Sequence, residues 1–110
     1  MSDVVSFISD AGGSVVSKNI LRHRGRLRWC VREESVNDFD NGWRFFSDID
    51  TEEYLSDADN MSICDFNTIA NIEPAILTIY NCKVGTDLEL VDENGKKYFL
   101  DNSTGKKFKV

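Results

Sequence analysis

An aromatic segment that runs directly into a cluster of carboxylates, within residues 41–60, constrains the fold of this chain more than any other feature. The aromatic part is built around Trp43, Phe45 and Phe46, and the acidic part begins at Asp48. Aromatic residues are typical of strands that pack against a core, whereas clustered carboxylates stay in contact with water. The segment therefore predicts a folded core that presents one strongly negative surface.

The chain has the length and apolar content of one soluble domain. With 110 residues, of which 41% are apolar, it can bury roughly 65% of its unfolded surface in a single core. No apolar run approaches the ~20 residues that span a bilayer, and no basic segment precedes an apolar one at the N-terminus. We therefore expect no membrane segment and no secretory signal.

The cysteines indicate a reducing compartment. They are odd in number and far apart, without the paired spacing of a disulfide framework or a metal site. We expect a cytoplasmic protein in which they act as small apolar residues. They are Cys30, Cys64 and Cys82.

Local patterns predict an α+β fold, a single compact domain with a mainly antiparallel sheet and two or three short helices. Turn signals are predicted at residues 23–25 and 40–42, and Asn94-Gly95 predicts a hairpin. Alternation of apolar and polar residues predicts the strands. These are residues 14–21, 27–32, 43–47, 88–91 and 97–100.

Three helical segments are expected between these strands. Ser2 can cap a first helix, which Gly12-Gly13 ends, and a short acidic helix is predicted from Ser47 or Asp48 through Leu55. Apolar residues from Ile63 to Tyr80 recur at roughly helical spacing, with Pro74 near the start of a second helical segment. The domain divides into an N-terminal helical extension (1–13), an α+β domain (14–101) and a C-terminal tail (102–110), which either adds a short strand or hangs free.

Charge is unevenly distributed along the chain. The net charge is −6, yet residues 33–65 hold 11 acidic side chains and one basic one, Arg44. Such a block repels nucleic acid and favours cationic partners, although on the charge pattern alone a solvated face that keeps the protein soluble is the preferred explanation. Alternation assigns the arginines of residues 22–28 to one polar face of a strand, so we expect no nucleic-acid binding.

No motif for catalysis or metal binding is found. A calcium-binding loop that starts at Asp48 places Glu53 where glycine is required, and one that starts at Asp57 places Met61 at a ligand position. His23 is the only histidine, and nothing around a cysteine indicates an activated thiol. We therefore predict no catalytic residue, no metal site and no cofactor.

Strand alternation places Trp43 and Phe45 on one face and Arg44 and Phe46 on the other. Aromatic residues in a strand usually belong to a core. If both faces are buried, Arg44 needs a carboxylate partner, for which Asp48 or Asp50 is close in sequence. We predict that Arg44 is structural and ion-paired within the fold.

Several short segments, taken in order, resemble the landmarks of one bacterial family. They are Val15-Val16-Ser17-Lys18, Val31-Arg32-Glu33-Glu34, Asp40-Asn41-Gly42-Trp43-Arg44-Phe45-Phe46-Ser47, Glu53-Tyr54-Leu55, Asp59-Asn60, Asp65-Phe66-Asn67-Thr68-Ile69, Pro74 and Val84-Gly85-Thr86. Over roughly residues 14–92 the chain resembles the immunity-protein-thirty-three-like domain. That resemblance implies a non-enzymatic immunity protein of a polymorphic toxin system, made in the cytosol, which binds and neutralises a cognate toxin.

The acidic cluster fits such a role, because opposite charge accelerates association and disfavours wrong partners. It favours a basic toxin, and a nuclease among basic toxins. A generic intracellular interaction module is the alternative, followed by a small enzyme, and the sequence leaves the oligomeric state open. The residues expected to bind the partner are Asp48, Asp50, Glu52, Glu53, Tyr54, Asp57 and Asp59.

Overall fold

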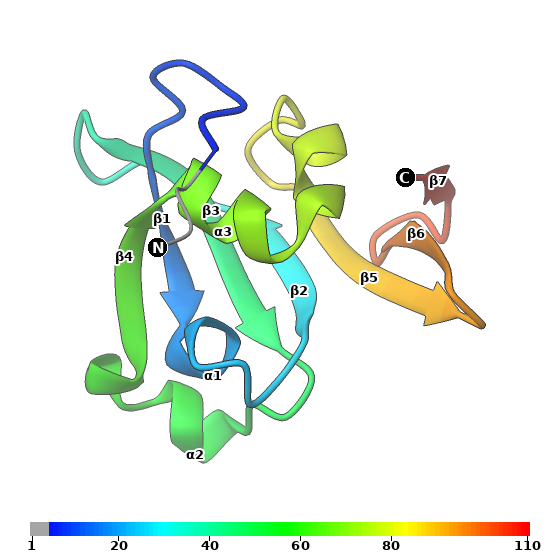
Figure 1. The fold of residues 1–110 in the computed structure, drawn as a ribbon, viewed down its shortest axis with the longest axis horizontal. Helices are drawn as coiled ribbons and strands as arrows, with labels where there is room; N and C mark the ends of the chain where they lie inside the picture. Colours follow the sequence, from blue (N-terminus) through cyan, green and yellow to red (C-terminus); the bar gives the residue numbers. More distant parts are fainter. Residues whose placement is uncertain (1–4) are drawn as a thin grey trace.

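A seven-stranded sheet organises residues 5–110, the part of the chain that the computed structural model describes (Figure 1). The strand order is β4-β1-β3-β2-β5-β6-β7, and β1 with β3 is the only parallel pair among the described residues. The expected α+β fold with a mainly antiparallel sheet is confirmed. The strands are β1 (Gly13–Ser17), β2 (Leu27–Arg32), β3 (Asp40–Ser47), β4 (Met61–Asp65), β5 (Asp87–Glu93), β6 (Lys96–Asp101) and β7 (Lys107–Lys109).

The helices are short and border the sheet. In Figure 1, α3 and the 3-10 helix η2 lie over one face, and α1 and α2 lie at the lower end of the strands. The core forms between that face and α3 with η2, where the Trp43 ring stacks on Phe45 with 5.9 Å between centroids. The helices are α1 (Lys18–Leu21), α2 (Glu52–Leu55), η1 (Ala58–Asn60), α3 (Phe66–Ile72) and η2 (Pro74–Ile79).

Strand β3 confirms the predicted alternation but begins earlier than expected. Trp43 and Phe45 are fully buried on the core face, while Arg44 and the half-buried Phe46 point to the other face. The turn predicted at residues 40–42 is wrong, because Asp40 already belongs to β3. Gly42 has a φ of +88°, and a Cβ at this position would overlap the carbonyl oxygen of Glu33. The glycine therefore serves a close backbone approach rather than a turn.

The strand predicted over residues 14–21 ends early. Ser17 caps α1 by accepting a hydrogen bond from the backbone N–H of Asn19 at 3.2 Å, so the last four residues are helical. The turn at residues 23–25 is confirmed, with His23 at a φ of 56°. Arg28 is consequently the only arginine of residues 22–28 within a strand, and the continuous polar strand face predicted there does not exist.

Two other helix predictions are shifted. The acidic helix ends at Leu55 as predicted but begins at Glu52, because Thr51 rather than Ser47 or Asp48 caps it. Ile63, which was assigned to a helix by its spacing, lies in β4. In that region α3 starts only after Asp65, whose side chain accepts a hydrogen bond from the Asn67 N–H at 2.8 Å.

The helix predicted for the N-terminal extension is absent from residues 5–12, and the remainder of that prediction lies outside the described residues. The side chains of two asparagines in α3 accept hydrogen bonds from backbone N–H groups of residues 5–8, which a helix would pair within itself. Asn67 Oδ1 accepts from the Phe7 and Ile8 N–H groups at 2.9 and 3.0 Å, and Asn71 Oδ1 accepts from Val5 N–H at 3.0 Å. Side chains of α3 thus hold this segment in an irregular conformation.

The β5–β6 hairpin is confirmed. Asn94 and Gly95 both have positive φ angles, 54° and 84°, as a two-residue hairpin turn requires. The tail adds the short strand β7, which pairs with β6 from Tyr98 to Leu100. The strand over residues 97–100 is therefore not a sheet edge, and β7 takes that position.

Candidate partner-binding surface

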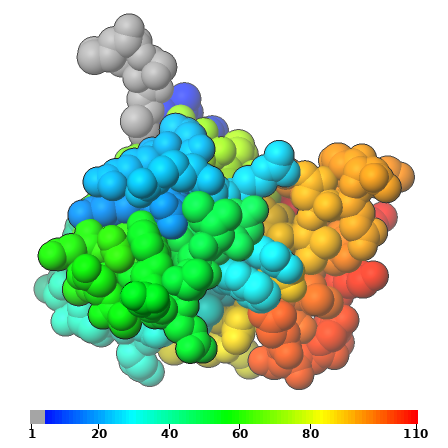
Figure 2. All heavy atoms as spheres, turned by 90° about the horizontal axis from the view of Figure 1, so that it is seen from below, coloured from blue at the N-terminus to red at the C-terminus, as the bar shows by residue number. Residues whose placement is uncertain are grey.

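The β3–β4 connection, residues 48–60, contains all the residues expected to bind a partner. It runs from the end of β3 through α2 and η1 to β4, and its atoms, green in Figure 2, form part of the face seen there. Asp50 and Tyr54 are half-buried, whereas the other five project into solvent. These five exposed carboxylates are Asp48, Glu52, Glu53, Asp57 and Asp59.

Local hydrogen bonds give this connection a defined shape. Thr51 Oγ1 accepts from the Tyr54 N–H at 3.1 Å, which starts α2 with Glu52 and Glu53 in its first turn. Asp57 caps η1 by accepting from the Asp59 N–H at 2.9 Å. The carboxylates of α2 are thus favourably placed against the helix dipole and still remain exposed.

Asp50 holds the fold together instead of facing solvent. Its carboxylate accepts from the Ser47 N–H and the Asn19 Nδ2 at 2.8 Å each, and from the Ser17 Oγ at 3.0 Å. Burial acts to raise the pKa of Asp50, but these hydrogen bonds outweigh it and the pKa lies below its ordinary value. The side chain ties the end of β3 to β1 and α1.

Arg44 has the structural role that was predicted, but with other partners. Its Nη1 and Nη2 donate to the two oxygens of Asp40 at 2.8 Å each, and its Nε donates to Glu33 at 3.3 Å. Neither Asp48 nor Asp50 contacts it in a salt bridge among the described residues. Hydrogen bonds from Arg44 hold the pKa of Asp40 well below its usual range, and the Asp40 carboxylate raises the pKa of Arg44.

The β2–β3 loop, residues 33–39, is a second acidic segment that sequence reasoning did not single out. Val36 and Phe39 project from it, with 78% and 56% of their surface exposed. Asn37 Oδ1 accepts from the Phe39 and Asp40 N–H groups at 3.0 and 2.9 Å, which gives the loop internal order. Two apolar residues within an acidic loop were the signal that the sequence offered.

The carboxylates of the β3–β4 connection are not neutralised by basic residues nearby in sequence. Residues 45–82 contain eight acidic side chains and no lysine or arginine. Among the described residues no salt bridge involves any of the five exposed carboxylates. This part of the molecule therefore has an unbalanced negative charge that attracts cations.

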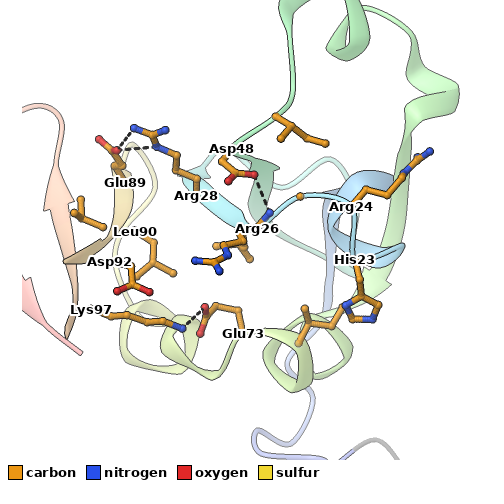
Figure 3. Close-up of a pocket in the computed structure, with 15 residues that line it drawn as sticks. His23, Arg24, Arg26, Arg28, Asp48, Glu73, Glu89, Leu90, Asp92 and Lys97 are labelled. Carbon is orange, nitrogen blue, oxygen red and sulfur yellow. Dashed lines mark hydrogen bonds and ion pairs between the residues drawn. The ribbon is translucent and has the colours of Figure 1, made fainter. Parts of the chain in front are cut away.

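A groove of about 820 Å³ lies where β5 diverges from β2 (Figure 3). The two strands pair only from Trp29 to Val31, and beyond that point the β5–β6 hairpin leans away. Ion pairs join groups of opposite charge there, Arg28 to Glu89 and Lys97 to Glu73, at 2.7 Å each.

Within residues 5–110, no three histidine, cysteine, aspartate or glutamate side chains are placed to hold a metal ion. All three cysteines are free, and burial raises the pKa of the Cys30 thiol well above its ordinary value. None of the helices described is long and apolar enough to cross a bilayer. Because Cys30 is buried and its pKa is raised, it does not provide an exposed thiolate nucleophile.

The fold and these surfaces define a small α+β protein that presents charge at its surface. The family model described as the Immunity protein Imm33 domain matches residues 14–101, which is most of the chain. The chain therefore belongs to the Imm33 immunity protein family, as its sequence resemblance indicated. No match was found among curated proteins or among solved structures.

Proposed function

We propose that this protein is a non-enzymatic, cytoplasmic immunity protein that binds and neutralises a cognate toxin through the β3–β4 connection. Membership of the Imm33 family supports the class. The observation that supports the surface is the exposure of five carboxylates without an ion-pair partner among the described residues. The partner is a protein with a cationic surface. A toxin that cleaves nucleic acid fits this best, because it needs a cationic surface to bind phosphates.

Electrostatics explains how such a surface serves neutralisation. A toxin that acts on phosphodiesters has a basic cleft, and exposed carboxylates occupy the place of phosphates in it. Charge complementarity accelerates encounter and disfavours wrong partners, with less effect on the affinity itself. The half-buried Tyr54 lies between the carboxylates of α2 and η1, where an aromatic side chain can anchor the contact.

The experiment that tests this proposal is capture of the toxin by the tagged protein from lysate of its own cells, in which toxin synthesis has been verified. Washes at low and then moderate salt distinguish a tight partner from weak ionic adsorption, because the Debye length is only about 10 Å at 0.1 M salt. We expect one basic protein at stoichiometric level. Its absence under these conditions would favour a generic interaction module.

A matched pair of variants tests the surface. Glu52→Gln combined with Glu53→Gln removes two charges from α2, while Asp92→Asn combined with Glu93→Gln removes two from the β5–β6 hairpin. The first should slow toxin association and make its rate less dependent on salt. The second should leave association almost unchanged. Equal effects of both would mean that net charge, rather than this surface, attracts the toxin.

A further inference from the structure

Strand β4 is an open edge of the sheet. Its five residues pair with β1 in an unbroken antiparallel register, from Gly13 opposite Asp65 to Ser17 opposite Met61. No other strand of residues 5–110 lies on its outer side, and Figure 1 shows β4 at the left border of the sheet. Within the described part of the chain, the outer side of β4 has no pairing strand and can accept one.

The hydrogen-bond alternation identifies which backbone groups face outward. The Phe66 N–H donates to the Gly12 carbonyl at 2.9 Å, which continues the β1–β4 register by one residue. Hydrogen-bonded and non-hydrogen-bonded pairs alternate in antiparallel strands, so the pair of Val15 and Ile63 is non-hydrogen-bonded. The N–H and C=O of Ile63 therefore point away from β1, toward the open edge.

The two edges of the sheet differ in their protection. The opposite edge, β7, has the sequence Lys107-Phe108-Lys109, and lysines on an edge discourage pairing. Strand β4 has no lysine, no proline and no bulge, and its central Ile63 is 68% exposed. Unlike β7, it keeps the features of a strand that accepts another.

The charges around β4 indicate what kind of strand fits. Asp57 and Asp59 precede it, Asp65 ends it, and the strand between them is uncharged. If β4 paired antiparallel with β4 of a second copy of this chain, Asp57 and Asp59 of each copy would lie near Asp65 of the other, and like charges would repel. A strand with cationic residues at its ends and an uncharged centre meets opposite charge at both ends instead.

We propose that β4 accepts an extended segment of the toxin, which adds an eighth strand to the sheet and neutralises the carboxylates at both ends of β4. Backbone hydrogen bonds to Ile63 hold the added strand, and its uncharged centre packs beside the Ile63 side chain. This inference rests on the proposed function for the identity of the partner. The chemistry of the edge is testable without the toxin.

The probe is a short synthetic peptide, blocked at both ends, with an alternating valine and threonine centre and lysines at each end. A matched peptide carries N-methyl groups on both edges of its centre, so it has the same charge but cannot donate backbone hydrogen bonds to a neighbouring strand. Amide NMR shifts of the protein should change along β4 for the first peptide and not for the second. Equal responses to both peptides, or no response, would overturn the proposal.

Variants of Ile63 test the position. Ile63→Pro removes the outward N–H without removing a β1–β4 hydrogen bond, and edge strands tolerate proline. The peptide should bind it about tenfold more weakly or worse, as expected for the loss of a backbone hydrogen bond at a central position. Ile63→Lys, which keeps the N–H, should weaken binding by repelling the peptide, and Phe108→Lys on β7 should leave it unchanged.

Failure of this inference is distinguishable from failure of the proposed function. If toxin capture depends on Glu52 and Glu53 but is unaffected in Ile63→Pro and Ile63→Lys, the toxin binds elsewhere and only the edge proposal fails. If the free protein sediments as a dimer that Ile63→Lys dissociates, a second copy occupies the edge, and the proposal is likewise overturned. Loss of both peptide binding and toxin capture in folded Ile63 variants would support it.

Discussion

The two acidic segments at opposite ends of β3 have similar compositions but differ in whether a basic side chain pairs with their carboxylates. In the β2–β3 loop and the first residue of β3, two carboxylates are bound to Arg44, with only 10% of the Arg44 side chain and 9% of the Asp40 side chain exposed. In the β3–β4 connection, Asp50 is drawn into the fold and Asp48 accepts a hydrogen bond from the Arg26 N–H at 2.9 Å. Five carboxylates, Asp48 among them, remain exposed without a salt bridge among the described residues.

The difference shows that acidic residues in a sequence do not by themselves create a negative surface. A carboxylate counts toward that surface only if the fold supplies no cation for it. Arg44 is the only basic residue between residues 33 and 82, and it pairs with Glu33 and Asp40 at the start of β3. The connection at the end of β3 has no equivalent, so its charge is available to a partner.

The largest effect on stability is expected from Arg44→Met. Removing one member of a buried ion pair leaves Asp40 charged and without its main partner, and this typically costs about 3 kcal/mol or more in the free energy of unfolding. Urea unfolding at neutral pH measures it. Arg28→Met is the control, because 44% of the Arg28 side chain is exposed and the loss of its ion pair with Glu89 should cost about 1 kcal/mol or less.

Equal stability of Arg44→Met and wild type would refute the structural role of Arg44. The double variant Arg44→Met with Asp40→Asn should recover part of the loss, because it removes the unpaired charge as well. Failure of the second substitution to recover any stability would assign the cost to packing around β3 instead.

A smaller loss is expected from Asp50→Ala, which distinguishes the internal carboxylate of the β3–β4 connection from its exposed ones. Ser17, Asn19 and Ser47 lose a shared acceptor, so the free energy of unfolding should fall by about 2 kcal/mol. Asp59→Ala is the control, with an expected change within about 0.5 kcal/mol. Similar results for the two variants would mean that the connection is uniformly exposed.

Much of the fold was predictable because local signals agreed with tertiary structure. The bounds of β2, the alternation in β3 and the Asn94-Gly95 turn were all confirmed. Predictions failed where side chains far apart in sequence competed with the local pattern. Asn67 and Asn71 bind the backbone of residues 5–8, and no periodicity within those residues could predict this.

The candidate surface was predictable in its location but not in its membership. The density of carboxylates identified the segment, whereas the role of Asp50 depends on residues about 30 positions away in sequence, Ser17 and Asn19. The prediction that Asp48 or Asp50 pairs with Arg44 was wrong for a related reason. Asp40 precedes Arg44 in what was predicted as a turn, and only the strand that replaces this turn brings the two side chains together.

The dependence of the free energy of unfolding on acidic pH should distinguish the bound carboxylates from the exposed ones. The pKa values of Asp40 and Asp50 are lower in the folded protein than in the unfolded chain. The unfolded state therefore binds more protons as the pH falls, and the stability that these groups contribute is lost below about pH 4, near their unfolded values. Urea unfolding from about pH 6 down to about pH 3 measures this loss.

The matched control for acid is the double variant Asp40→Asn with Arg44→Met. It lacks the group whose pKa is most clearly lowered, so its free energy of unfolding should fall less steeply with decreasing pH than that of the wild type. An equal slope in both proteins would assign the acid sensitivity to other carboxylates and would weaken the contrast between the two segments.

The smallest effect on stability is expected from Glu52→Gln combined with Glu53→Gln. Both side chains lie in the first turn of α2, where negative charge near the helix dipole contributes about 0.3 to 1 kcal/mol at most. Because α2 has only four residues and Thr51 still caps it, the unfolding midpoint in urea should barely move. A loss of about 2 kcal/mol would instead make these residues part of the fold, like Asp50. A small loss together with slower toxin association would leave binding as the reason for their exposed charge.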